Sequence, residues 1–145
     1  MLESCQEAPK GVMTGLRGAF DFEIVDEFMD HYELMCEQME PTILALEHEA
    51  GYGENIEGLF RIFHNIKSAS GYLHLEQLNH LAAFVEDQLE KARHDPGPAS
   101  SGFIDWLLLA SDQCNTWLCD LKCDHPEFAK INREIFYLPE RMERT

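Results

Sequence analysis

Long apolar segments are missing from this 145-residue sequence. Apolar runs stay as short as Trp106 to Ala110, whereas a membrane-spanning helix needs about 20 consecutive apolar residues. Residues 1–15 also lack the basic start and the continuous apolar stretch of a secretory signal. We therefore expect a soluble, cytoplasmic protein.

Basic residues are scarce. The sequence contains 11 Lys and Arg against 27 Asp and Glu, which gives a formal net charge of −16. An acidic field repels nucleic acids and anionic membrane surfaces, so we expect neither as a partner. The charge fits a partner with a basic or metal-loaded docking face, and it is equally explained by solubility alone.

Motifs for nucleotide and di-iron chemistry are also absent. No Gly-x-x-x-x-Gly-Lys-Ser/Thr loop is present to cradle nucleotide phosphates, and no Glu-x-x-His pair is present to hold a di-iron centre. The five cysteines are an odd number without a dense framework, which favours free thiols in a reducing compartment.

A zinc site is the one metal hypothesis that the cysteines support. Cys114, Cys119, Cys123 and His125 follow one another with four, three and one intervening residues, a spacing that matches no standard zinc finger. Cys114 also belongs to an apolar stripe. We therefore predict no metal site and keep a metal-binding helical protein as a rival interpretation.

Apolar residues recur at three- and four-residue spacing along four segments, which indicates amphipathic helices and an all-α fold. The first helix begins after Asp21 as its N-cap, with a kink or break expected near Glu40 because Pro41 interrupts the stripe. The other three are expected over 55–71, 76–93 and 103–121. Their short connections predict an antiparallel four-helix bundle.

The bundle is expected to occupy residues 20–122. Residues 1–19, with Pro9 and three glycines, are expected to form a lead-in that contains at most a short helix. Residues 123–145 are expected to form a short helix, from Pro126 to about Tyr137, and a tail.

His64 is the candidate functional residue. In a helix over 55–71 it lies at the edge of the apolar stripe, with Arg61, Lys67 and Ser68 one turn away. A neutral, partly exposed imidazole is a competent nucleophile. Lys67 would offset the charge of a phosphoryl group, and Ser68 could donate a hydrogen bond to it. By these residues alone, a solvated surface histidine is the commoner explanation.

The segment LFRIFHNIKSASG, residues 59–71, resembles the phosphorylation-site helix of histidine phosphotransfer (HPt) domains, in particular the amino-terminal HPt domain of chemotaxis histidine kinases. That family shows a Phe-Arg pair, matched by Phe60-Arg61, before a His-x-x-Lys matched by His64 and Lys67. The similarity extends through Met39–Leu46 and through residues 75–93, and covers roughly residues 20–122.

The resemblance implies a phosphocarrier in two-component signalling rather than an enzyme. It implies that His64 accepts the phosphoryl group on Nε2, with Lys67, Ser68 and Arg61 in support. A glutamate on the next helix, which falls on Glu86, would bind Nδ1 and fix the tautomer. Expected partners are a response-regulator receiver domain and a histidine kinase catalytic domain. Either would supply Mg²⁺, so no cofactor of its own is expected.

Three positions depart from the family pattern. Ser68 stands where a glycine usually follows the lysine, His74 replaces a later glycine, and Ala83 replaces a histidine three residues before Glu86. These departures keep open an HPt-like scaffold that docks receivers without accepting phosphoryl. The sequence fits both a free-standing protein and the amino-terminal piece of a larger kinase.

Overall fold

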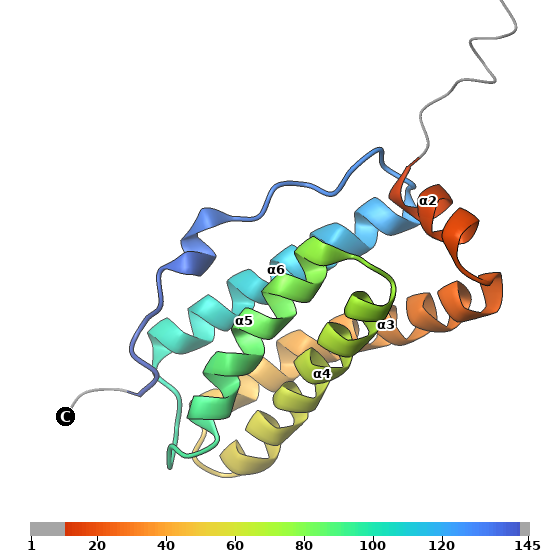
Figure 1. Ribbon diagram of the computed structural model, residues 1–145. Coiled ribbons are helices and arrows are strands. Elements are labelled where there is room, and N and C mark those ends of the chain that lie inside the picture. Colours follow the sequence, from red (N-terminus) through yellow and green to blue (C-terminus); the bar gives the residue numbers. More distant parts are fainter. Residues whose placement is uncertain (1–10, 143–145) are drawn as a thin grey trace, which may run out of the picture.

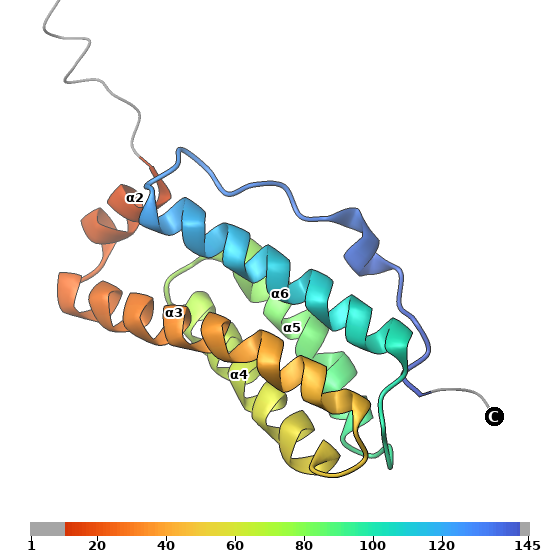
Figure 2. The same cartoon turned by 180° about the vertical axis from the view of Figure 1, so that it is seen from behind.

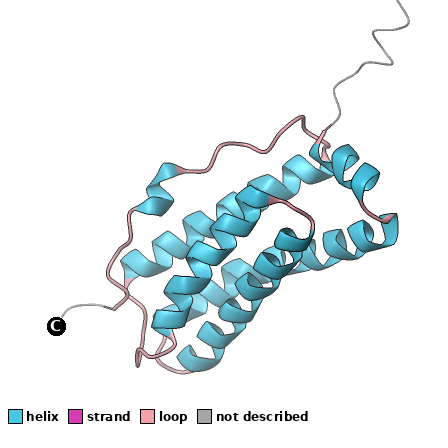
Figure 3. Cartoon of the chain, viewed as in Figure 1, coloured by secondary structure: helices cyan, strands magenta, loops and turns pink. Residues whose placement is uncertain are grey.

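The computed structural model describes residues 11–142, and every regular element in this range is a helix (Figure 1, Figure 3). The helices are α2 (Val12–Ala19), α3 (Phe22–Leu44), α4 (Tyr52–Tyr72), α5 (Glu76–Ala92) and α6 (Ser101–Lys122), with two short 3-10 helices, η1 (Ala45–Glu47) and η2 (Arg133–Phe136). The predicted all-α fold is confirmed. None of the described helices is long and apolar enough to cross a membrane.

Helices α3 to α6 form an up-and-down bundle in which each helix contacts its two neighbours and α6 closes the ring against α3 (Figure 1, Figure 2). The predicted stripes of α5 and α6 are buried in full, and those of α3 and α4 largely so. Met29, Met35 and Phe60 are only half-buried at the edges. Side chains of all four helices meet in one core, which includes Tyr32, Phe63, Leu89 and Trp117.

Helix α3 is not broken near Glu40, so the predicted break is wrong. The helix continues through Pro41 to Leu44. Pro41 lies in the last turn, where its missing N–H removes a single backbone hydrogen bond, and its own carbonyl still accepts from the N–H of Ala45. Ile43, fully buried one half-turn later, holds this turn against the core.

Helix α4 begins at Tyr52, three residues before the predicted start. Gly51 precedes it with φ +78°, a left-handed conformation that glycine adopts without strain. Tyr52 is buried, and its hydroxyl donates to the carbonyl of Ala92 at 3.2 Å. This packing recruits the first turn into the helix despite Gly53.

The predicted helix over 126–137 is present only as η2, and it does not begin at Pro126. The preceding residues are extended along α6 (Figure 1). Side chains of α6 satisfy their backbone: Trp117 Nε1 donates to the carbonyl of Ala129 at 2.8 Å, and Asp120 accepts from the N–H of Ala129 at 2.8 Å. These hydrogen bonds satisfy backbone groups that a helix would otherwise pair, so the segment stays extended rather than forming a helix.

The short helix expected within residues 1–19 is α2, which packs on α3 and α6. Its N-terminus is capped from the other end of the chain: Asp124 accepts from the N–H of Thr14 at 2.9 Å and from its hydroxyl at 2.5 Å. A Cβ on Gly11 would lie 2.0 Å from the Asp124 carbonyl oxygen, so only glycine fits there. Residues 1–10 and 143–145 lie outside the described residues, and the bounds of the lead-in stay a prediction.

We expect Trp117→Phe to lower the free energy of unfolding by about 0.5–1.5 kcal/mol, because it removes the donor to the half-buried carbonyl of Ala129. Trp117→Ala should cost more, about 3–5 kcal/mol, because it also empties the core. Urea unfolding followed by circular dichroism measures both. No measurable loss in Trp117→Phe would show that the hydrogen bond contributes nothing.

Candidate functional site

His64 lies midway along α4, at the boundary between the core and solvent. Phe63 and Ile66 on either side of it point inward and are fully buried. The His64 side chain itself is 52% exposed. The edge position follows from helical geometry, because a residue about 100° from the apolar face can reach neither the centre of the core nor full solvation.

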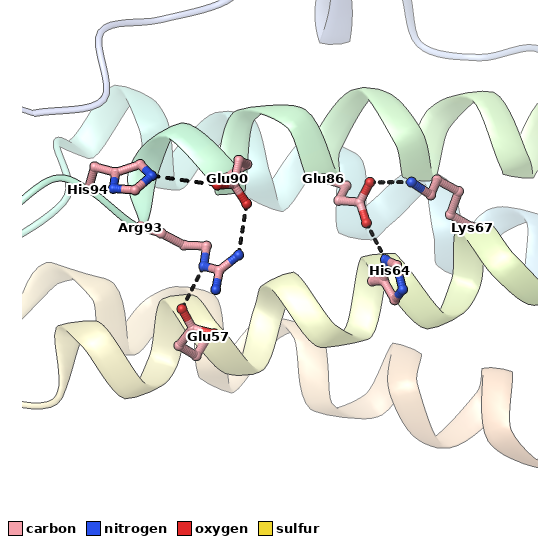
Figure 4. Close-up of polar contacts among 7 residues, drawn as sticks. All are labelled: Glu57, His64, Lys67, Glu86, Glu90, Arg93 and His94. Carbon is pink, nitrogen blue, oxygen red and sulfur yellow. Dashed lines mark hydrogen bonds and ion pairs between the residues drawn. The ribbon is translucent and has the colours of Figure 1, made fainter.

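Glu86 of α5 reaches the imidazole across the α4–α5 interface. Its Oε2 lies 2.5 Å from His64 Nδ1, and its Oε1 accepts from Lys67 Nζ at 2.5 Å (Figure 4). Only 13% of the Glu86 side chain is exposed. One carboxylate thus binds both the histidine and the lysine, with one oxygen for each. The contact of Glu86 with His64 was expected, and the contact with Lys67 is a finding of the structure.

The charge of Glu86 is stabilised at this position. Burial by itself would raise the pKa of its carboxyl, but the hydrogen bonds from Lys67 and His64, together with their charges, lower the pKa below its ordinary value of 4.5. Glu86 is therefore ionised at neutral pH, and an ionised carboxylate has only acceptor atoms.

That ionisation fixes the tautomer of His64. The 2.5 Å contact can be a hydrogen bond only if Nδ1 carries the proton and donates it to Glu86. In the neutral imidazole Nε2 is then unprotonated, with its lone pair available. The site therefore holds a nucleophilic nitrogen in a fixed orientation on an accessible surface.

The supporting residues are placed unequally. Lys67 is bound to Glu86, rather than standing free beside Nε2. Arg61 and Ser68 are exposed, and within residues 11–142 neither side chain forms a hydrogen bond or an ion pair. The structure thus brings together His64, Lys67 and Glu86 and leaves the other two on the surface nearby.

An aromatic contact that the sequence did not single out completes the surroundings of His64. The Phe60 ring stacks on the imidazole, with centroids 6.0 Å apart and planes at 11°. The guanidinium carbon of Arg93 lies 4.4 Å from the centroid of the same ring. Arg93 is held by Glu57 at 2.6 Å and Glu90 at 2.8 Å (Figure 4). The i, i+4 spacing of Phe60 and His64 is the signal that could have predicted the stack.

The unusual residues have different structural settings. His74, in the turn between α4 and α5, has φ +60°, which explains why a glycine suits this position. Ala83 lies half-buried one turn before Glu86. Ser68 is exposed on the turn that follows His64.

The four residues of the metal hypothesis do not converge. Cys114 is buried in the core, whereas Cys119 and Cys123 are exposed with their sulfurs 3.8 Å apart. The His125 ring binds Asp120 instead. Within residues 11–142 no group of three or more His, Cys, Asp or Glu side chains is placed to hold a metal ion.

Comparison with known proteins gives a consistent picture. The family model described as "Hpt domain" matches residues 26–117. The chain is 30% identical over 100 residues to "Sensor histidine kinase CheAY" of Helicobacter pylori, covering 69% of this chain and 12% of that protein. It is 26% identical over 90 residues to "Chemotaxis protein CheA" of Treponema pallidum, covering 62% of this chain and 11% of the relative. No solved structure matches.

The lowered pKa of Glu86 predicts a pH-dependent contribution to stability. A depressed carboxyl pKa stabilises the fold above the unfolded pKa, near 4.5, and this stability is lost as the pH falls through the lower folded value. We therefore expect Glu86→Gln to be less stable than the wild type at about pH 6, and the difference to shrink at about pH 3.5. Urea unfolding at both pH values measures it. A difference that stays constant with pH would contradict the assigned charge.

Proposed function

The chain belongs to the Hpt domain family, and from this we propose that it accepts a phosphoryl group on Nε2 of His64 and relays it in two-component signalling. The family match and the relatives support histidine phosphotransfer of this general kind. The observation that carries the assignment to His64 is the 2.5 Å contact between Glu86 and Nδ1, which leaves Nε2 as the free nucleophile.

In the proposed reaction the lone pair of Nε2 attacks the phosphorus of an aspartyl phosphate on a receiver domain. The N–P bond forms as the P–O bond to the aspartate breaks, and the aspartate leaves as a carboxylate. The reverse reaction returns the phosphoryl group, and a kinase domain could also deliver it from ATP. The receiver or the kinase supplies Mg²⁺ and most of the transition-state stabilisation.

Glu86 contributes by holding the proton on Nδ1. When Nε2 forms its bond to phosphorus, positive charge develops on the imidazole, and a carboxylate 2.5 Å from Nδ1 stabilises it. Because Glu86 stays ionised, no proton has to move during the transfer. The ring is also prevented from turning its protonated nitrogen toward the donor.

In this proposal Lys67 interacts with two anions, the Glu86 carboxylate and the phosphoryl group. In the unphosphorylated protein its ammonium neutralises Glu86. Its side chain is 35% exposed, so it is accessible to an incoming phosphoryl group next to His64. The formal charge of −16 makes any nearby cation valuable to a doubly charged phosphoryl group. Exposed Arg61, one turn before His64, is a second cation available for this purpose.

We propose a receiver domain and a histidine kinase catalytic domain as partners, a phosphocarrier role without enzymatic activity, and a cytoplasmic location. Nucleic acids and membranes do not enter the proposal. The matched region accounts for only 12% and 11% of the two relatives, so their activities as whole proteins are no guide to this chain alone. Both a free-standing carrier and a segment of a larger kinase fit the site.

The alternative is a scaffold that docks receivers without accepting phosphoryl. Ser68 favours it, because this exposed side chain occupies the position at which the family resemblance expects a glycine beside the reactive histidine. The alternative keeps the docking surface and removes the chemistry. It therefore predicts receiver binding without labelling.

The labelling test compares wild type, His64→Gln and Glu86→Gln after incubation with a phosphorylated receiver, read by intact mass at neutral to alkaline pH. We expect one acid-labile adduct on the wild type and none on His64→Gln. Glu86→Gln should be labelled more slowly by about tenfold or more, because its amide no longer favours the reactive tautomer. If the wild-type protein binds the phosphorylated receiver but acquires no phosphoryl adduct, the result would support the scaffold instead.

Ser68→Gly tests the effect of the departure beside the reactive histidine. If the hydroxymethyl group crowds the partner, the variant should accept phosphoryl from a receiver a few-fold faster than the wild type. His74→Gly is the matched control, because it relieves a left-handed φ away from the imidazole and should leave the rate unchanged. Stopped time courses with one receiver measure both. Equal rates for Ser68→Gly and the wild type would remove crowding as an explanation.

A further inference from the structure

A second histidine has the same local arrangement as His64. His125 follows the end of α6, and its Nδ1 lies 2.6 Å from Oδ1 of Asp120. The His125 side chain is 47% exposed, and that of Asp120 only 7%. At the first site the corresponding values are 52% for His64 and 13% for Glu86. In both places a largely buried carboxylate contacts Nδ1 of a half-exposed imidazole.

The Asp120 carboxylate is held rigidly. Its Oδ2 accepts from the N–H of Ala129 at 2.8 Å, while its backbone carbonyl accepts from the N–H of His125 at 2.9 Å. Oδ1 is left to bind the imidazole, so Nδ1 must carry the proton and donate it. In the neutral ring Nε2 is then unprotonated, as it is at His64.

The other ion-paired histidines have the opposite arrangement. In His48 and His94 it is Nε2 that faces a carboxylate, of Glu47 and Glu90 respectively, and each distance is 3.5 Å. A carboxylate there favours the tautomer with the proton on Nε2. Among the histidines that the structure describes, a carboxylate within ion-pair distance of Nδ1 is found only at His64 and His125.

We propose that His125 is a second nucleophilic imidazole, which accepts a phosphoryl group through Nε2 from small donors of the phosphoramidate class. The lone pair of Nε2 attacks phosphorus, the N–P bond to the ring forms, and the P–N bond of the donor breaks. Ammonia leaves with its own protons. The proton on Nδ1 stays there, hydrogen-bonded to Asp120, and the carboxylate balances the positive charge of the ring.

The second site lacks the cation of the first. Lys67 binds Glu86, whereas no Lys or Arg side chain of residues 11–142 forms an ion pair with Asp120. Asp124 and Glu127 flank the loop with negative charge. A doubly charged donor is therefore less stabilised at His125, and we expect its phosphorylation to be slower than that of His64. A small donor needs no docking surface, so the proposal does not depend on a protein partner.

The experiment uses the full chain incubated with phosphoramidate at neutral pH, followed by site-resolved mass spectrometry under non-acidic conditions. His48 and His94 in the same molecules serve as internal comparators. We expect phosphoryl occupancy at His125 to exceed that at either comparator by about tenfold, because of these three histidines only His125 has a carboxylate on Nδ1 that leaves Nε2 unprotonated. His64→Gln should still be labelled at His125, and the double variant with His125→Gln should be labelled only at the low level of the comparators.

Asp120→Asn tests the positioning by the carboxylate. Its amide can donate to Nδ1, which favours the tautomer with the proton on Nε2, so occupancy at His125 should fall by about tenfold. Unchanged labelling of His64 in the same molecules serves as the folding control. Occupancy at His125 no higher than at His48 and His94 in the wild-type protein would overturn the proposal, whatever the behaviour of Asp120→Asn.

Discussion

The carboxylate of Glu86, placed between α4 and α5, is the interaction on which the site depends. A carboxylate that is only 13% exposed is costly to bury unless both of its oxygens find donors. Here Lys67 binds one oxygen and His64 the other, each at 2.5 Å. The same contacts that make the buried charge tolerable also set the proton on Nδ1 and orient the ring. Under the proposed function, the stability and the reactivity of this site therefore have a common cause.

The bundle supplies what the local sequence cannot. His64 and Glu86 are 22 positions apart and meet only because the tight turn at Leu73–Leu75 returns α5 antiparallel to α4. His74 takes up the left-handed conformation that this turn requires. Phe60 stacks on the imidazole, and the guanidinium of Arg93 lies over the Phe60 ring. Nε2 of His64 is thus held at the surface of α4 and α5, whose opposite faces are buried in the core.

Periodicity was sufficient to predict the helices whose one face is buried, above all α5 and α6. It failed where tertiary contacts override local preference: the packing of Tyr52 draws Gly53 into α4, and Pro41 is tolerated in the last turn of α3. It also failed at residues 126–132, where side chains of α6 form hydrogen bonds with a backbone that was expected to be helical. Long-range hydrogen bonds of this kind leave no spacing pattern in the sequence.

The residues of the candidate site could be predicted from the sequence only in part. His64 and Lys67 stood out because of a motif, and Glu86 only through resemblance to a family, since its own neighbours in sequence say nothing of a histidine on another helix. That Lys67 binds Glu86, and that Phe60 stacks on the imidazole, required the structure. The contact between Asp120 and His125 also required the structure, because their spacing in the sequence matches no known motif.

The most direct test of this account is nitrogen-15 NMR of histidine-labelled protein before and after phosphorylation by a receiver. We predict that His64 carries its proton on Nδ1 before the reaction and its phosphorus on Nε2 afterwards, with the Nδ1 proton retained. A proton on Nε2 in the resting protein, phosphorus on Nδ1, or an unmodified His64 after the receiver has lost its phosphoryl group to the protein would contradict it.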